Sequence, residues 1–232
     1  MQAIKLSRIE PSTSIWKSND PAHKLARDLP ELQGPPWPGP CGGANQIIWD
    51  SFREDRFHGP DLYSEETKLK IKPAPGKIVA RTYIAQLPDT DDTGAIRTDA
   101  YDACLAVQAP RRSDNPADTY AGLKFGAAKG GYYALLVDAS GRVAVYDAHG
   151  GQPSALLPWQ PLDGARSGAG AVNILHIEVK AAAATLFVNG RKLDLSPLDL
   201  KAERSAIGFE AASEPSRQDT WKFLWAAATE SQ

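Results

Sequence analysis

Short runs in which hydrophobic and polar residues alternate follow one another along most of this chain. They predict strands at residues 46–52, 69–72, 76–86, 99–108, 119–127, 131–138, 142–148, 155–160, 172–180, 184–188, 191–195, 206–212 and 221–228. Turn-forming residues separate these runs at intervals of about 8–12 residues, which is typical of β-sandwiches and β-barrels. The pattern therefore predicts an all-β protein.

Two of the turns indicate how the strands pair. Asn189-Gly190 separates TLFV from RKLDL, and a two-residue hairpin loop needs the positive φ angles that Asn and Gly adopt at low cost. Ser140-Gly141 separates two further strands in the same way. Consecutive hairpins place antiparallel strands side by side, so the pattern argues against a βαβ fold. Segment 180–187 (KAAAATLF) has high helix propensity, but it lies between an alternating run and the Asn-Gly turn, which favour a strand.

The first 44 residues have a different composition from the rest. Their prolines are Pro11, Pro21, Pro30, Pro35, Pro36, Pro38 and Pro40. The run GPPWPGPCGG (34–43) excludes a helix or strand interior, whereas Asp20 and Pro21 are typical of the start of a short helix. Trp16 and Trp37 favour an arm that packs on the sandwich over a disordered linker. We therefore expect an irregular N-terminal arm at 1–44 and a sandwich at 45–232.

Composition and charge exclude some partners. The chain has 232 residues, of which 42% are hydrophobic and 23% charged, with a formal net charge of −2. This balance gives no reason to expect binding to nucleic acid or to an anionic membrane. No apolar run is long enough to span a bilayer, and the start of the chain lacks the apolar core of a signal peptide. The sequence leaves two locations open: the cytoplasm if Met1 is native, or export if a leader was removed.

The chain has two cysteines, Cys41 and Cys104. They lie too far apart in the sequence to match a zinc motif, which has short-range pairs of Cys or His. They form one disulfide if the protein is exported, or two buried thiols if it is not. Two cysteines are too few to act as the framework of a large domain, which slightly favours free thiols.

Several segments together resemble a known group of domains. These are the hairpins of 120–151, Trp159 with the Gly-rich loop 163–170, the strand that Asn173 opens, LFVNGRKL (186–193), AIGFEAAS (206–213) and the aromatic strand WKFLW (221–225). They resemble bacterial concanavalin A-like or laminin-G-like jelly rolls, including those related to 3-keto-glycoside hydrolases. The resemblance covers residues 46–228 and implies a two-sheet antiparallel jelly-roll sandwich. The group includes sugar-binding modules, glycosidases and adhesion domains, so the resemblance does not select an activity.

Catalytic carboxylates are the first chemistry to test. Glycosidases of this fold usually present an E-x-D-x-E array, whose alternate side chains share one face of a strand. Here Glu210 and Glu214 are the nearest match, but Ala212 occupies the alternate position between them. We therefore interpret Glu210 as a structural or rim carboxylate and assign no catalytic residues. His176 lies within a predicted strand, where a hydrogen-bonded wall residue is the expected role.

One loop has the composition of a metal site. Segment 88–102 carries Asp89, Asp91 and Asp92, whose oxygens suit calcium, and Gly94 permits a sharp turn. The loop lacks the EF-hand spacing, and solvated acidic loops are commoner than ion sites. Calcium is thus the one cofactor that the sequence suggests, and the sequence indicates no other.

Aromatic and polar residues suggest a ligand rim. Tyr132 and Tyr133 are adjacent in a strand, so one faces the core and the other faces outward. The predicted binding rim consists of the outward tyrosine, Trp159, and three residues of the loop 111–115: Arg112, Asp114 and Asn115. Aromatic rings stack on sugar rings, and the polar side chains form bidentate hydrogen bonds with sugar hydroxyls. Near the C-terminus, Trp221, Phe223 and Trp225 are expected to share one face as core residues.

Three functional hypotheses follow from these features. The first is a non-catalytic jelly-roll module that binds carbohydrate or another protein. The second is a glycoside-active enzyme, a hydrolase or lyase of the 3-keto-glycoside type, with acid and base residues brought together on the concave face. The third is a structural protein that assembles through its N-terminal arm. The expected partner is thus a carbohydrate or a protein, and the sequence predicts no oligomeric state.

Overall fold

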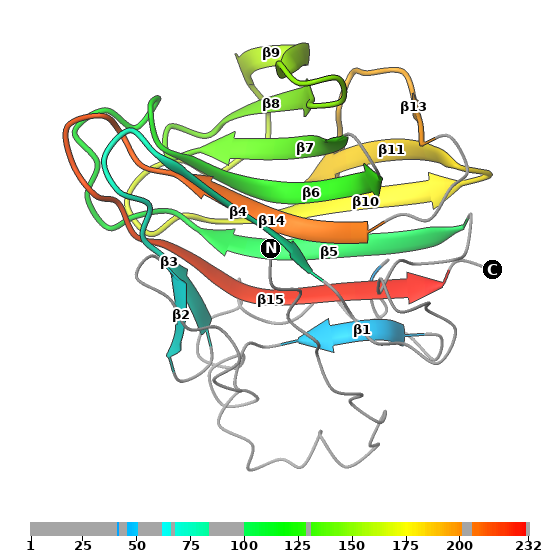
Figure 1. The fold of residues 1–232 in the computed structure, drawn as a ribbon, viewed down its shortest axis with the longest axis horizontal. Helices are drawn as coiled ribbons and strands as arrows, with labels where there is room; N and C mark the ends of the chain where they lie inside the picture. The colour runs from blue at the N-terminus through cyan, green and yellow to red at the C-terminus, as the bar shows by residue number, and fades with distance from the viewer. Residues whose placement is uncertain are drawn as a thin grey trace.

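The computed structural model describes residues 41, 46–50, 62–65, 68–83, 100–128, 131–200 and 206–230. Every regular element in these ranges is a β-strand, and the strands form two antiparallel sheets (Figure 1). The predicted all-β sandwich of the jelly-roll type is confirmed. None of the described elements is a helix that is long and apolar enough to cross a membrane.

The larger sheet has nine strands. In spatial order its main path is β12 (Arg191–Lys192), β11 (Ala183–Val188), β10 (Val172–Lys180), β5 (Tyr101–Gln108), β15 (Trp221–Glu230), β3 (Lys68–Ile71) and β2 (Leu62–Glu65). Two further strands join it, because β1 (Gln46–Asp50) pairs with the second half of β15 and β13 (Leu198–Asp199) pairs with β11. Strands β5 and β15, from distant parts of the chain, therefore lie side by side at the centre (Figure 1).

The smaller sheet has six strands. Its order is β4 (Ile78–Tyr83), β14 (Ala206–Ala212), β6 (Tyr120–Ala128), β7 (Gly131–Asp138), β8 (Arg142–Asp147) and β9 (Ser154–Pro161). Strands β6 to β9 form consecutive hairpins, as their alternation and turn residues predict. Strand β14 enters from a distant part of the sequence and pairs with β6 on one side and β4 on the other.

The hydrophobic core lies between the two sheets. Alternate residues of the strands in both sheets contribute to it, and its largest fully buried side chains are Trp221, Tyr101, Phe125, Phe209 and Phe223. The buried indole N–H of Trp221 donates to Thr119 Oγ1 at 2.9 Å, and this hydroxyl donates to the Ala212 carbonyl at 2.9 Å. The one polar atom of the largest core side chain is thus hydrogen-bonded, as burial requires.

A β-bulge corrects the prediction for the last strand. Trp221 and Phe223 belong to the core, but the pairing of β15 with β5 shifts register between Phe223 and Trp225. The extra residue turns Trp225 away from the core, and it packs in a second cluster with Cys41 and Cys104. The expectation that all three aromatics share one face is therefore wrong for Trp225.

The cysteines are joined. Cys41 and Cys104, 63 residues apart in sequence, form a disulfide with a Cα–Cα distance of 5.9 Å. The interpretation that favoured free thiols is wrong. Because Cys104 lies in the middle of β5, the bond fastens residue 41 to the central strands of the larger sheet.

A tight turn overrides the local helix propensity of the alanine-rich segment. The alanine-rich segment 180–187 is a hairpin, in which Ala181 and Ala182 adopt φ of 48° and 60° and link β10 to β11. The next turn has positive φ at Asn189 and Gly190, as predicted. The sequence pattern missed the short strands β2 and β13. The predicted arm at 1–44, apart from Cys41, lies outside the described residues.

Candidate functional site

The outer face of the six-stranded sheet carries a buried carboxyl group, that of Glu210. Cross-strand pairing places Glu210 of β14, Gly122 of β6, Leu136 of β7 and Ala144 of β8 in one row. Paired residues share a face, and the residues before and after each of them point into the core. Glu210 therefore points away from the core.

Gly122 shapes the space beside Glu210. A Cβ atom at this position would lie 2.2 Å from the Leu135 carbonyl oxygen and 2.5 Å from Leu136 Cδ2. Only glycine fits so close an approach. The Leu136 side chain thus occupies the space over Gly122, and it gives the row next to Glu210 an apolar wall.

Glu210 is buried and accepts a side-chain hydrogen bond from Tyr132. It is 5% exposed, and the hydroxyl of Tyr132 donates to its Oε2 at 3.2 Å. Burial raises the pKa of the Glu210 carboxyl above its ordinary value, although the charge of Lys124 and the Tyr132 hydrogen bond act in the opposite direction. Glu210 therefore retains its proton to a higher pH than a solvent-exposed glutamic acid.

Tyr132 is a permanent donor toward this carboxyl. Burial, and then the negative charge of Glu210, raise the pKa of Tyr132 to about 12. The Nζ atom of Lys124 lies 3.7 Å from the centre of the Tyr132 ring, a distance at which the cation interacts with the ring face. Together Lys124, Tyr132 and Glu210 form a compact polar cluster on this face.

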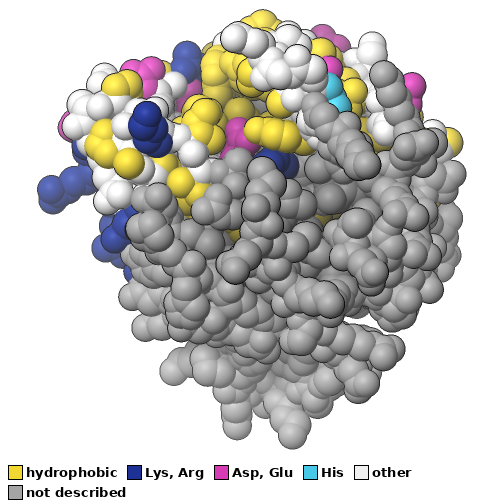
Figure 2. Space-filling model, in the orientation of Figure 1, with side chains coloured by type: hydrophobic (Ala, Val, Ile, Leu, Met, Phe, Trp, Pro, Cys, Tyr) yellow, Lys and Arg dark blue, Asp and Glu magenta, His cyan; other side chains and the backbone are white. Residues whose placement is uncertain are grey.

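Aromatic rings continue from this cluster along the same face. Tyr120 of β6 lies 5.6 Å from Trp159 of β9, and the Arg142 guanidinium lies 5.8 Å from the Trp159 ring centre. Burial, followed by the charges of Glu210, Tyr132 and Tyr146, raises the pKa of Tyr120 above its ordinary range. Figure 2 shows hydrophobic, acidic and basic side chains close together in a hollow of the described surface. The face thus combines an acid with stacking surfaces.

The arrangement is suited to proton transfer. A carboxyl with a raised pKa beside a phenol hydroxyl can act as a proton donor and, once ionised, as a proton acceptor. Among the described residues, the groups that act on Glu210 are Lys124 and Tyr132, so this part of the chain brings no second carboxylate into contact with it. The cluster supplies one acid of the pair that glycoside hydrolysis ordinarily uses.

The two adjacent tyrosines face opposite sides of the sheet, as predicted. Tyr133 packs against Phe125 at 5.7 Å and against the His149 ring at 4.8 Å, and its hydroxyl donates to the Asp199 carbonyl. Tyr132 is the outward tyrosine. Its contact with Glu210 has no signal in the sequence, because the two residues are 78 positions apart and meet only through the register of three strands.

The predicted ligand loop lies in a separate network. The Asn115 backbone N–H donates to Glu214 Oε2 at 2.8 Å, and Arg217 Nη1 lies 3.4 Å from Asp114 Oδ2. A second nitrogen of Arg217 donates to the Arg112 carbonyl. These contacts fasten the loop to the segment after β14. These contacts do not bring the loop to Tyr132. Trp159, the other aromatic residue of the predicted rim, lies against Tyr120.

Two further groups of residues concern metal binding. Asp89, Asp91 and Asp92 lie outside the described residues, so calcium at this loop stays a prediction. In the described ranges one group of metal-ligand side chains comes together, formed by Cys41, Cys104 and His176 on the nine-stranded sheet.

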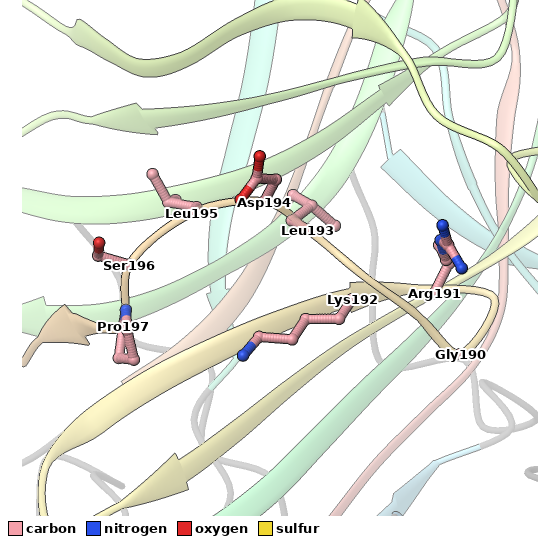
Figure 3. Close-up of a pocket in the computed structure, with 8 residues that line it drawn as sticks. All are labelled: Gly190, Arg191, Lys192, Leu193, Asp194, Leu195, Ser196 and Pro197. Atoms are coloured by element: carbon pink, nitrogen blue, oxygen red, sulfur yellow. The ribbon is translucent and has the colours of Figure 1, made fainter.

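A surface hollow lies beside that larger sheet. Its lining is the continuous segment from Gly190 to Pro197 (Figure 3), and its volume is about 600 Å³. The segment brings one carboxylate, Asp194, and the exposed cations Arg191 and Lys192. An open hollow with a single carboxylate offers no acid–base pair, so the Glu210 cluster is the stronger candidate site.

Comparisons with known proteins agree with the fold. No protein-family model matches the chain, and no curated protein is similar to it in sequence. Among solved structures, the GH43 protein BlXynB from Bacillus licheniformis has a TM-score of 0.51 and 12% identity, covering 82% of this chain and 40% of that one. Xylan β-1,4-xylosidase from Bacillus halodurans has a TM-score of 0.52 and 12% identity, covering 78% and 39%. LamAcat from Zobellia galactanivorans has a TM-score of 0.51 and 9% identity, covering 81% and 98%.

These neighbours correct the first functional hypothesis. This chain spans about two fifths of the length of the GH43 and xylosidase structures, and at these identities the likeness shows the fold alone. The sandwich is nevertheless shared with glycoside hydrolases, which overturns the expectation of a non-catalytic module and agrees better with its alternative, a glycoside-active enzyme. The chain has a jelly-roll-like β-sandwich fold that solved carbohydrate-active enzymes also contain.

Proposed function

We propose that this protein is an enzyme that cleaves glycosidic bonds, with Glu210 as its proton donor. The observation that carries the proposal is the Glu210 carboxyl, which is buried, has a raised pKa and is hydrogen-bonded by Tyr132 on the outer face of the smaller sheet. A buried acid is costly to the fold, and such groups cluster at functional sites. The xylosidase and GH43 structures with the same fold support this reaction class.

Each member of the cluster has a role in this chemistry. The protonated Glu210 carboxyl gives its proton to the glycosidic oxygen as the bond from that oxygen to the anomeric carbon breaks, and the bonding electron pair stays on the oxygen. The Tyr132 hydroxyl and the Lys124 charge stabilise the carboxylate that remains. Tyr120 and Trp159 provide ring faces against which sugar rings stack. Water then adds to the anomeric carbon, and its proton passes to the Glu210 carboxylate, which restores the acid.

The proposal extends to the fold class and the substrate. The order of hairpins over residues 120–151 supports a concanavalin A-like jelly roll. One neighbour is a xylosidase, and LamA has been solved with laminaritriose and laminaritetraose. Xylo-oligosaccharides and laminari-oligosaccharides are therefore the first substrates to examine, followed by 3-keto-glycosides.

The test is direct. Purified chain is incubated with each oligosaccharide from acid to mildly alkaline pH, and new reducing ends and shorter products are measured. We expect products from at least one substrate, with the Glu210→Gln variant as the inactive control. Equal product formation by this variant would exclude Glu210 as the donor, and no product from any glycoside would overturn the proposal.

Replacing Tyr132 by phenylalanine is expected to shift the pH dependence of the reaction. Its hydroxyl favours the charged form of Glu210, so its removal raises the Glu210 pKa further. Because the general acid acts in its protonated form, the alkaline limb of the rate profile should move to higher pH. The Tyr133→Phe variant is the matched control, since Tyr133 bonds to a backbone carbonyl and makes no contact with Glu210. An unmoved limb in Tyr132→Phe contradicts the assignment.

A further inference from the structure

A second group of chemically active side chains lies on the outer face of the nine-stranded sheet, away from Glu210. Cys104 of β5 and His176 of β10 are direct cross-strand partners, so their side chains share a face. Cys41 joins them through its disulfide to Cys104. One ring nitrogen of His176 and the two sulfur atoms all lie within 4.8 Å of one another. Three potential metal ligands thus converge from distant parts of the chain.

The histidine ring is already held in a fixed orientation. His176 Nε2 lies 2.6 Å from Asp102 Oδ1, and the ring stacks on Phe187 with a centroid distance of 4.8 Å and an interplanar angle of 20°. With Nε2 engaged by the carboxylate, Nδ1 is the nitrogen left for a metal ion. A ligand histidine whose other nitrogen bonds to a carboxylate is the usual arrangement of zinc sites.

Burial and charge favour a divalent cation with soft ligands. Cys41 is 0% exposed, Cys104 1% and His176 8%, and the apolar residues beside them include Trp225. Two thiolates and a neutral imidazole balance the charge of Zn²⁺, so the complex adds no net charge to an apolar region. The oxygen ligands that calcium or magnesium requires are not those of this group.

We propose that, once the Cys41–Cys104 disulfide is reduced, Cys41, Cys104 and His176 bind Zn²⁺, with Asp102 orienting the His176 ring. A dithiol reductant transfers two electrons and two protons to the disulfide and is itself oxidised to a disulfide, leaving two thiols. Zinc then displaces the two thiol protons and forms two Zn–S bonds. The sulfur atoms separate to the roughly 3.8 Å that Zn–S bonds of about 2.3 Å require in a tetrahedral site, and water takes the fourth position.

The sequence pattern argued against zinc because it looked for ligands close together along the chain. Here the ligands come from residue 41, from the middle of β5 and from β10, and only the register of β5 and β10 brings Cys104 opposite His176. The inference does not depend on the proposed activity, since it concerns the other sheet.

The experiment uses the full, untagged chain in its oxidised form and after anaerobic reduction with a phosphine. Each form is equilibrated with Zn²⁺ or Co²⁺ and freed of excess metal. We expect the reduced chain to retain one zinc ion and the oxidised chain to retain none. With Co²⁺, the reduced chain should show the thiolate charge-transfer band and the visible bands of a tetrahedral site.

Variants identify the ligands. His176→Phe keeps a ring that can stack on Phe187 but removes the nitrogen, and it should abolish retention of the metal. Asp102→Asn should weaken zinc affinity by about 10- to 100-fold, because it alters only the orienting partner. His149→Phe is the matched control, since His149 also bonds to an aspartate, Asp147 at 2.7 Å, but has no cysteine partner. Its metal retention should equal that of the unmodified chain.

Two results would overturn the proposal: no zinc retained by the reduced chain, or retention that His176→Phe leaves unchanged. If reduction unfolds the chain in the absence of metal, the near-ultraviolet circular dichroism after addition of Zn²⁺ decides the question. Recovery of the folded signal supports the site, and failure to recover it counts against the site.

Discussion

Replacing Glu210 by glutamine is expected to lower the rate of glycoside cleavage by about 10²- to 10⁴-fold, the usual contribution of a positioned general acid. The amide is nearly isosteric and still accepts the Tyr132 hydrogen bond, but it has no proton of comparable acidity to give. Rates are measured on the best oligosaccharide substrate over a range of pH. The Glu178→Gln variant serves as control, because Glu178 pairs with Lys180 on the other sheet and should leave the rate unchanged.

The same substitution should not weaken the fold. The folded-state pKa of Glu210 is raised above its unfolded value, so its favourable contribution to stability is complete below the unfolded pKa. That contribution is lost as pH rises through the folded-state pKa. Glutamine does not ionise, and above this range Glu210→Gln should be at least as stable as the unmodified chain in urea unfolding. A variant that loses activity because it unfolds would instead indicate a structural role for Glu210.

The strands that alternate clearly were predictable from the sequence, whereas the positions of their partners were not. Alternation and turn residues located β7, β10 and β14 at their observed bounds, because each covers one face of the core. Short strands such as β2 and β13, of four and two residues, are too brief to show a period. The local sequence pattern therefore predicts a strand best when the strand is long and covers a large part of the core.

Bulges and strand register determine the candidate site, and neither is visible in a local pattern. One register shift in β15 moves Trp225 to the outer face, and another separates Phe125 from Ala128 in the hairpin that carries Tyr132. Glu210 was interpreted as a structural or rim carboxylate because Ala212 occupies the alternate position between it and Glu214. Its partners Tyr132 and Lys124 come from two other strands. A search within single strands could not identify that cluster.

Removing the disulfide is expected to lower the free energy of unfolding by about 4 kcal/mol. The bond closes a loop between residues 63 positions apart, and the chain-entropy estimate for a loop of that size is about 4 kcal/mol at 25 °C. Cys104 lies in β5, whose two neighbours are β10 and β15, so the constraint acts on the central strands of the larger sheet. Unfolding in urea of the oxidised chain and of the Cys41→Ala/Cys104→Ala variant measures the difference.

A chelator in both samples separates the effect of the disulfide on stability from the effect of metal binding. A reductant added to the alanine variant should leave its stability unchanged, because that variant has no thiols. The oxidised chain should lose stability on reduction by an amount close to that of the double substitution. Zn²⁺ added to the reduced chain should restore part of the loss, since a ligand that binds only the folded state stabilises it. Equal urea midpoints for the oxidised chain and the double variant would contradict this expectation, because the cross-link restricts the unfolded chain and should raise the free energy of unfolding.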